Sequence, residues 1–298
     1  MPQKKVVLEE LEALNSLKEL AESYEEVAVV RMQKIKESVL KTRKFLSSLS
    51  DVFVDLKASY GREMKELLEK VKKGDQNILT TLQKNGKHLF VYLASNGKLY
   101  GSVTQKTYRL FIAEVKKTDP KDADIVILGR AGKEMYDASG TTNPYSYFEI
   151  PDTSVDLSHI KTLMQLFLKY DQVNIFYGKF GNVVQQTPIE TSISGEDVFE
   201  TEMPMQVPRE DRFIFEPTLE QILHFFETQI MANLFSQTLL ENQLARHASR
   251  VSAMEEALVN IELEEKKLHQ QQVRLKHLVQ NKKQLETISG VLSLNDDS

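Results

Sequence analysis

Residues 217–294 constrain the fold of this chain more than any other stretch. The segment has no proline after Pro217 and no glycine before Gly290, and these are the residues that most often end a helix. At about 1.5 Å per residue, a continuous helix here would be over about 100 Å long, several times the diameter of a small domain. It therefore cannot be an ordinary helix inside a globular core.

The apolar residues of this segment recur with the spacing of a coiled coil. Alternating intervals of three and four residues separate Val251, Met254, Leu258 and Ile261. The same phase continues through Glu265, Leu268, Gln272, Leu275, Val279 and Lys282, so that polar residues interrupt the stripe. The apolar phase then moves to Leu278, Leu285, Ile288 and Leu292. The sequence predicts a helix from about Thr218 to Ser293 whose partner changes along its length.

A second long helix is predicted at the other end of the chain, from about Lys5 to Val71. Gly61 is the one glycine in this stretch, and the apolar residues again follow a helical period. They include Leu11, Leu14, Leu17, Leu20, Tyr24, Val27, Ile35, Val39, Leu49 and Phe53. Chain closure should bring the two helices together as an antiparallel coiled coil, with Met254, Leu258 and Ile261 on the seam. Because the N-terminal helix is shorter, one end of the C-terminal helix should project beyond it.

The middle of the chain has the pattern of a small α/β domain. Three short apolar runs, 88–94, 124–128 and 173–177, predict buried strands. Helical patterns at 103–115 and 155–170 separate them, which gives the βαβαβ order of a parallel sheet.

Two further extended runs are expected at 182–189 and 212–215, on either side of a surface loop at 190–211. The predicted fold class is thus α/β, with a Rossmann-like domain and a small, mainly parallel sheet at 76–212. The coiled-coil helices would occupy 1–75 and 213–298.

Composition excludes several classes of function. The formal net charge is −5, so the chain lacks the basic footprint of a nucleic-acid-binding protein. It has no cysteine, which excludes disulfides, thiolate catalysis and thiolate metal sites. No apolar run approaches twenty residues, so direct membrane insertion is not expected.

The motifs that could carry chemistry are weak. Gly129-Arg130-Ala131-Gly132-Lys133 follows a predicted strand, but it matches neither the dinucleotide nor the P-loop fingerprint. The same is true of Asn96-Gly97 and Gly101-Ser102. None of the six histidines forms a metal-ligand pair, and there is no G-x-S-x-G. We therefore predict no catalytic, cofactor or metal site, while a nucleotide-binding α/β enzyme and a coiled-coil scaffold stay open as alternatives.

The residues of the last helix carry a family resemblance. Glu241-Asn242 is followed by Ala248-Ser249-Arg250-Val251-Ser252-Ala253-Met254, with Ala257 and Asn260 beyond. This tract resembles the E-N…A-A-R-M-x-A-M-x-x-A-x-x-N pattern of the gamma subunits of F-type ATP synthases. Phe213-Ile214-Phe215-Glu216-Pro217 is similar to that family's Y-L-Y-E-P, and Ile288-Ser289-Gly290 to its closing E-I-V-S-G. Shorter matches around Met32 and Tyr177 extend the resemblance over the whole chain.

The chain also departs from the family pattern. The family's K-I-T-K-A-M corresponds to Glu19-Leu20-Ala21-Glu22-Ser23-Tyr24, so two cations are replaced by anions. In the last helix, an acidic residue of the family is replaced by a cation within 276–283. The chain therefore resembles a divergent member.

The resemblance implies a rotor shaft that couples ion flow, of protons by implication, to ATP synthesis or hydrolysis on the beta subunits. Implied partners are three alpha and three beta subunits, the epsilon subunit and the c-ring, on the cytoplasmic side of the cell membrane. No cofactor is implied. The implied subunit contacts are Arg31, Met32, Met254, Lys276, His277, Ile288, Val291, Leu292 and Leu294.

Overall fold

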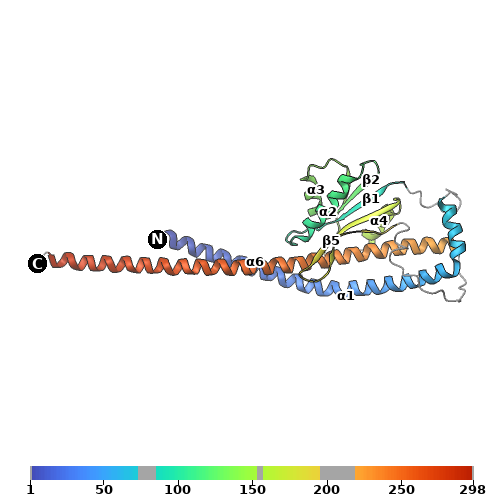
Figure 1. Cartoon of the computed structure of the whole chain (residues 1–298). Helices are drawn as coiled ribbons and strands as arrows, with labels where there is room; N and C mark the ends of the chain where they lie inside the picture. The colour runs from blue at the N-terminus through green and yellow to red at the C-terminus, as the bar shows by residue number, and fades with distance from the viewer. Residues whose placement is uncertain (1, 73–84, 153–156, 195–218, 297–298) are drawn as a thin grey trace. The chain divides into compact units, whose positions relative to one another are not determined.

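A computed structural model describes residues 2–72, 85–152, 157–194 and 219–296 (Figure 1). The two predicted long helices are present as α1, Pro2–Lys72, and α6, Leu219–Asp296. The chain divides into two compact units, which we describe separately. Residues 1–28 and 251–298 form the helical unit, and residues 29–250 form the sheet unit.

In the helical unit, α1 and α6 pack antiparallel, as predicted. Val7 and Leu11 form an apolar cluster with Leu268. Further along α1, Lys18 Nζ lies 3.9 Å from Glu262 Oε1 and 3.8 Å from Glu265 Oε2. Later residues of α1 thus contact earlier residues of α6, so the two helices run antiparallel.

The predicted stripe on α6 is the seam of this pair. Every member from Val251 to Leu275 is buried or half-buried, including Met254, Leu258 and Ile261, at intervals of three and four residues. Beyond Leu275 the expectation was wrong, because Val279 and Lys282 are exposed with all other residues of 276–288. The seam ends there because α1 begins at Pro2 and its first buried seam residue is Val7.

The stripe predicted on α1 needs a correction. Leu17, Leu20 and Val27 are about half exposed, at 52%, 50% and 45%. Within residues 4–28, Leu11, Leu14 and Tyr24 of the predicted stripe are buried or half-buried, and so are Val7, Lys18, Ala21, Glu25 and Ala28. The apolar residues of α1 therefore form two stripes, and only one of them faces α6.

The sheet unit contains five strands in the order β3-β2-β1-β4-β5. They are β1 His88–Leu93, β2 Ala123–Leu128, β3 Tyr145–Phe148, β4 Gln172–Phe180 and β5 Gln186–Ser192. All neighbours are parallel except β4 and β5, which form an antiparallel hairpin. The prediction of a small, mainly parallel sheet is confirmed. Val91 pairs with Val126 on one side and Ile175 on the other, so β1 is the central strand.

The helices between the strands are α2 Val103–Lys117, α3 Arg130–Asp137 and α4 Leu157–Phe167. Strand β3 and helix α3 were not predicted, which makes the order longer than βαβαβ. Strand β5 begins at Gln186 rather than 182, because Asn182 Oδ1 accepts the backbone N–H groups of Val184 and Gln185 in a turn. It continues to Ser192, three residues into the predicted loop. Residues 195–211 of that loop and the run 212–215 lie outside the described residues.

Both faces of the sheet are covered, which explains why β1 is a continuous apolar run. On one face, Leu89 and Val91 pack with Phe167 of α4 and Phe235 of α6. On the other face, Tyr92 packs with Phe111 of α2 and Tyr136 of α3. Helix α6 is therefore part of the core of the sheet unit and not an appendage to it.

Candidate functional site

Ten consecutive residues of α6, Glu241 to Arg250, are all buried. A helix that is buried on every side is normally apolar, yet seven of these ten residues are polar. Buried polar groups need hydrogen-bond partners, so this tract must be matched by specific groups around it. The tract and the groups that it binds are the candidate functional site, which we call the sheet–helix clamp.

Asn242 joins α6 to two neighbouring strands. Its Oδ1 accepts the backbone N–H of Gly178 in β4 at 3.1 Å, and its Nδ2 donates to the carbonyl of Leu93 in β1 at 3.2 Å. A Cβ on Gly178 would lie 2.7 Å from Val103 Cγ2 of α2, so the glycine leaves room for α2, while α6 stays at ordinary contact distance, 3.5 Å from Ala245 Cβ. The carboxyl end of the sheet is thus held directly on the helix.

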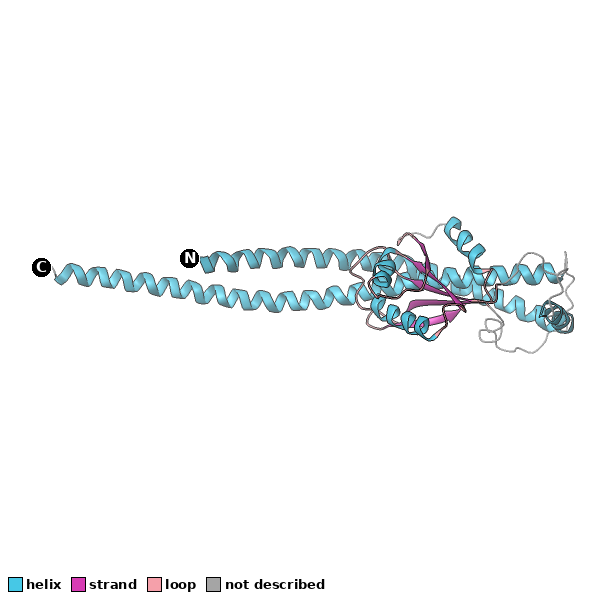
Figure 2. Cartoon of the chain, turned by 90° about the horizontal axis from the view of Figure 1, so that it is seen from above, coloured by secondary structure: helices cyan, strands magenta, loops and turns pink. Residues whose placement is uncertain are grey.

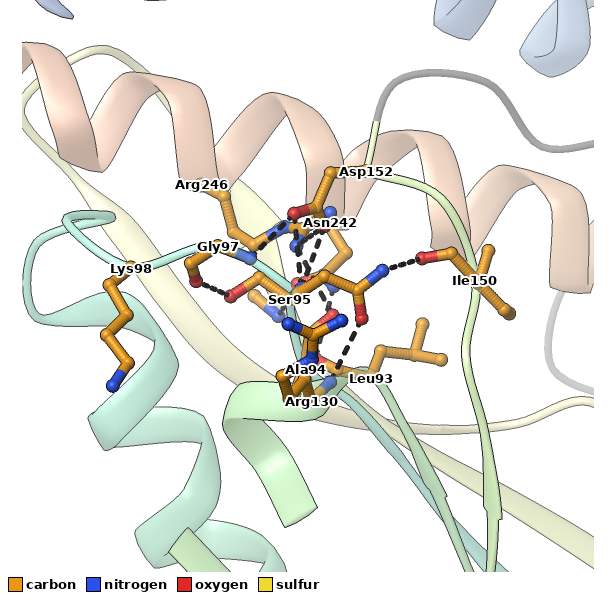
Figure 3. A network of polar contacts seen from close by, with 12 residues as sticks. Leu93, Ala94, Ser95, Gly97, Lys98, Arg130, Ile150, Asp152, Asn242 and Arg246 are labelled. Carbon is orange, nitrogen blue, oxygen red and sulfur yellow. Dashed lines mark hydrogen bonds and ion pairs between the residues drawn. The ribbon is translucent and has the colours of Figure 1, made fainter. Parts of the chain in front are cut away.

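Arg246 forms the central ion pair of the clamp (Figure 3). Its Nη1 donates to Asp152 Oδ1 at 2.7 Å and to the carbonyl of Ala94 at 3.3 Å. The side chains of Arg246 and Asp152 are only 6% and 15% exposed. Burial alone would raise the pKa of Asp152, but the charge of Arg246 and two backbone donors outweigh it, so the pKa lies below its usual value.

The loop after β1 is folded around the same carboxylate. Asp152 accepts the backbone N–H groups of Asn96 and Gly97, with Gly97 N 2.9 Å from Oδ2. Asn96 in turn donates to the carbonyl of Ile150 at 2.8 Å and accepts the backbone N–H of Arg130 at 3.0 Å. The clamp therefore also ties together the ends of β1 and β3 and the start of α3.

These contacts explain the glycine-rich turn at 129–133. Gly129 has a φ of 101°, and a Cβ there would lie 2.9 Å from the carbonyl of Ser95. A Cβ on Gly132 would lie 2.6 Å from Ala94 Cβ. The N–H groups of Arg130 and Ala131, which would face a phosphate at a helix N-terminus, already donate to Asn96 and Ser95. The glycines thus serve close packing.

Arg250 holds the far end of the loop. Its Nε and Nη2 donate to the carbonyls of Leu99 and Lys98 at 2.8 and 2.9 Å, and its guanidinium lies 3.9 Å from the centre of the Tyr100 ring. The loop presses closely on the helix here, since a Cβ on Gly101 would lie 2.4 Å from Ser249 Oγ. Leu99 has a φ of 64°, an unusual conformation that the two hydrogen bonds maintain.

Helix α1 meets the opposite side of the tract. Arg43 Nη2 lies 2.8 Å from Glu241 Oε1, and Gln237 Nε2 donates to the same oxygen at 3.1 Å. The Glu241 side chain is 2% exposed, while that of Arg43 is 45% exposed. This pair fixes the register of α1 against α6 within the sheet unit.

The residues predicted to contact other subunits occupy different environments. Arg31 and Met32 are half-buried on α1, and Met254 is half-buried on the seam. Lys276 and His277 are exposed, and Ile288 is 57% exposed. Val291, Leu292 and Leu294 lie within the bounds of α6, but their side chains are outside the described residues. Of these, Lys276 and His277 share one exposed stretch of α6 with Ile288.

Comparison with known families and proteins identifies the architecture. Residues 3–283 match the family model described as ATP synthase. The ATP synthase gamma chain of Pelagibacter ubique is 25% identical over 295 residues, covering 95% of this chain and 96% of that protein. The gamma chain of Cytophaga hutchinsonii is 23% identical and covers 99% of this chain and 100% of its own length. The chain belongs to the gamma-subunit family of ATP synthases. As a gamma subunit it is a non-catalytic member of that complex.

Solved structures show the same fold. A chain of the Euglena gracilis mitochondrial ATP synthase, described as OSCP/F1/c-ring in rotational state 3, aligns with a TM-score of 0.65 at 12% identity. That alignment covers 98% of this chain and 95% of the other. A chain from the central stalk and c-ring of the Tetrahymena thermophila enzyme aligns with a TM-score of 0.52 at 19% identity, covering 80% and 99%.

The sheet–helix clamp of this gamma subunit was not predicted from the sequence, for an identifiable reason. Asp152 and Arg246 are 94 residues apart, and nothing local marks Asp152 as a partner. One signal was available, because Asn242, Arg246 and Arg250 recur every four residues and so lie on one helix face. A polar stripe on a helix is ordinarily its solvent-facing side, so this signal did not by itself mark the tract as buried.

His247 gives the clamp a predicted pH dependence. The imidazole is 2% exposed and packs edge-on to Tyr100 at 5.7 Å. Burial, and then the charges of Arg246, Arg250 and Arg31, lower its pKa from 6.5 to about 4. As pH falls below about 6.5, the unfolded chain binds the proton while the folded chain does not, so stability falls until about pH 4. The loss should total about 3 kcal/mol.

Urea unfolding followed by circular dichroism at pH 7.5 and pH 5 measures this loss. His247→Gln should show a smaller loss of stability between the two pH values than the unmodified chain. His269→Gln, at an exposed position of α6, is the control and should behave like the unmodified chain. An identical pH dependence in all three proteins would refute a neutral, buried His247.

Proposed function

We propose that this gamma subunit acts as the rotating shaft of an F-type ATP synthase, with catalysis on the beta subunits. One observation carries the proposal. Helix α6 is unbroken from Leu219 to Asp296, is clamped to the sheet by buried polar contacts, and continues into the exposed stretch 276–288. A twist applied to the sheet unit would therefore pass into the helix through fixed bonds rather than through a flexible linker.

The proposed partners are three alpha and three beta subunits around the helices, with the epsilon subunit and the c-ring near the sheet. The proposed contacts to alpha and beta include the exposed Lys276 and His277, together with Arg31, Met32 and Met254. Such contacts would differ at each rotational position, so each beta subunit would be biased toward a different conformation. The apolar residues Ile288, Val291, Leu292 and Leu294 are proposed to turn within an apolar sleeve, because apolar burial is non-directional.

Two further parts of the proposal concern the complex. We propose that it transports protons, and that the chain lies on the cytoplasmic side of the cell membrane as a peripheral subunit. Among the residues that the structure describes, no helix is long and apolar enough to cross a membrane. We also propose that the chain divides into an N-terminal helix at 1–75, a central domain at 76–212 and a C-terminal helix at 213–298.

Purification of the tagged full-length chain from cells that encode it tests the proposal. The chain should elute with alpha and beta subunits in a ratio of three to three to one, and the complex should hydrolyse ATP. Detergent-solubilised membranes should in addition yield the c-ring. Recovery of the chain alone, or only as a homo-oligomer, would contradict the assignment as a shaft.

A further inference from the structure

Helix α1 carries an exposed apolar stripe in the helical unit that the seam does not use. Val6, Ala13, Leu20 and Val27 recur every seven residues and are all exposed, with Leu20 at 50%. Leu17, at 52%, lies next to them along the helix. The seam residues Val7, Ala21 and Ala28 each follow a stripe residue by one position, which places the stripe about 100° around the helix from the seam.

The second seven-residue repeat on α1 is acidic. Glu12, Glu19 and Glu26 are exposed and directly precede Ala13, Leu20 and Val27. Between residues 9 and 26 the chain has seven glutamates and a single cation, Lys18. Lys18 lies against Glu262 and Glu265 of α6, so it does not neutralise the outer surface. On α6, residues 255–265 add five glutamates and no lysine or arginine.

This charge pattern opposes helix formation in the free chain. Glu9 and Glu12, Glu19 and Glu22, and Glu22 and Glu26 are like charges three or four residues apart, which repel each other on a helix surface. An approaching cation would remove this repulsion. An exposed apolar stripe likewise gains stability when another surface covers it. Both features are therefore best satisfied by the same kind of partner, one that is apolar at its centre and basic around it.

We propose that this face of α1, which we call the acidic face, docks a basic, apolar-centred surface of the surrounding alpha and beta subunits. The inference rests on the proposed function and specifies the chemistry of the partner. The acidic face would repel nucleic-acid phosphates and anionic lipid headgroups. Two copies of the face would also repel each other, which disfavours pairing of the chain with itself. Complementary charge would favour binding to the chain's own alpha and beta subunits and speed assembly with them. The apolar stripe would supply contact area.

Reconstitution of the full-length chain with its own alpha and beta subunits at increasing salt concentration tests this inference. Binding should weaken as salt rises, since charge complementarity is screened. The triple variant Glu12→Lys, Glu19→Lys and Glu26→Lys should bind about tenfold or more weakly at low salt, and its affinity should no longer fall with salt. The double variant Leu20→Ser and Val27→Ser should bind more weakly at every salt concentration.

A charge-matched control separates the face from net charge. Asp119→Lys, Asp122→Lys and Asp171→Lys change the net charge equally at exposed positions of the sheet unit, and should leave binding to alpha and beta unchanged. Circular dichroism should show that every variant stays helical. If the triple glutamate variant binds like the unmodified chain, the basic partner is refuted while the shaft assignment stands. If the unmodified chain forms no complex with alpha and beta, the proposed function fails and this inference with it.

Sedimentation of the free chain tests whether a second copy of the chain covers the apolar stripe. The unmodified chain should be monomeric at the concentrations used for reconstitution. Self-association that the double variant Leu20→Ser and Val27→Ser abolishes would show that a second copy covers the stripe, and would overturn the proposal.

Discussion

Replacement of Arg246 by alanine should destabilise the sheet unit by roughly 3–5 kcal/mol, the usual cost of leaving one charge of a buried ion pair without its partner. Asp152, whose side chain is 15% exposed in the intact pair, would lose its charged partner. The carbonyl of Ala94 would also lose a donor. Of the ion pairs described in this chain, the one between Arg246 and Asp152 has both side chains most deeply buried.

Urea unfolding at pH 7.5 measures the effect, with circular dichroism as the signal because the chain has no tryptophan. Arg130→Ala is the matched control, since Arg130 pairs with Glu149 at 3.0 Å with side chains 59% and 49% exposed. An exposed pair of this kind contributes about 1 kcal/mol or less. A double-mutant cycle with Asp152→Ala would isolate the pair itself. Equal losses for Arg246→Ala and Arg130→Ala would show that the clamp does not hold the sheet on the helix.

Leu268→Asp should have a comparably large effect on the helical unit. Leu268 is 6% exposed and packs with Val7 and Leu11, so an aspartate there would bury a carboxylate among apolar side chains. The cost is several kcal/mol, enough to separate the first turns of α1 from α6. Leu268 is a stronger test of the seam than Leu258, which is only half-buried.

Hydrogen exchange measured by mass spectrometry resolves this prediction along the chain. Amides of residues 5–20 should lose protection in Leu268→Asp, while those of β1 and β2 should not change. Leu263→Asp provides the control, because Leu263 is 52% exposed and off the seam. Unchanged protection of residues 5–20 in Leu268→Asp would rule out the seam.

The regular parts of the fold could be predicted from the sequence. Long stretches with a single glycine and no proline marked α1 and α6, and apolar runs marked β1, β2 and β4. The shorter elements gave too little signal. Strand β3 has four residues at the edge of the sheet, and α3 has eight residues of which only Gly132 and Tyr136 are buried. Periodicity cannot reveal elements that bury so few side chains.

The site was less predictable than the fold. The two apolar stripes of α1 overlap in sequence, and Leu17 and Leu20 look equivalent to Leu11 and Leu14 until the register against α6 is known. Arg246 and Asp152 meet only because the fold brings the segment after β3, which carries Asp152, to the helix. Family resemblance highlighted Arg250 through its motif, but it did not indicate what the arginine binds.

Rotation of the chain within its complex tests the central claim most directly. Because the chain has no cysteine, Thr142→Cys at an exposed position of the sheet unit would give a unique attachment point for a bead. With the alpha and beta subunits fixed to a surface, ATP should drive continuous rotation of the bead in one direction, and rotation should stop when ATP is removed. A bead that stays still, or moves without a preferred direction, while the complex hydrolyses ATP would contradict the account.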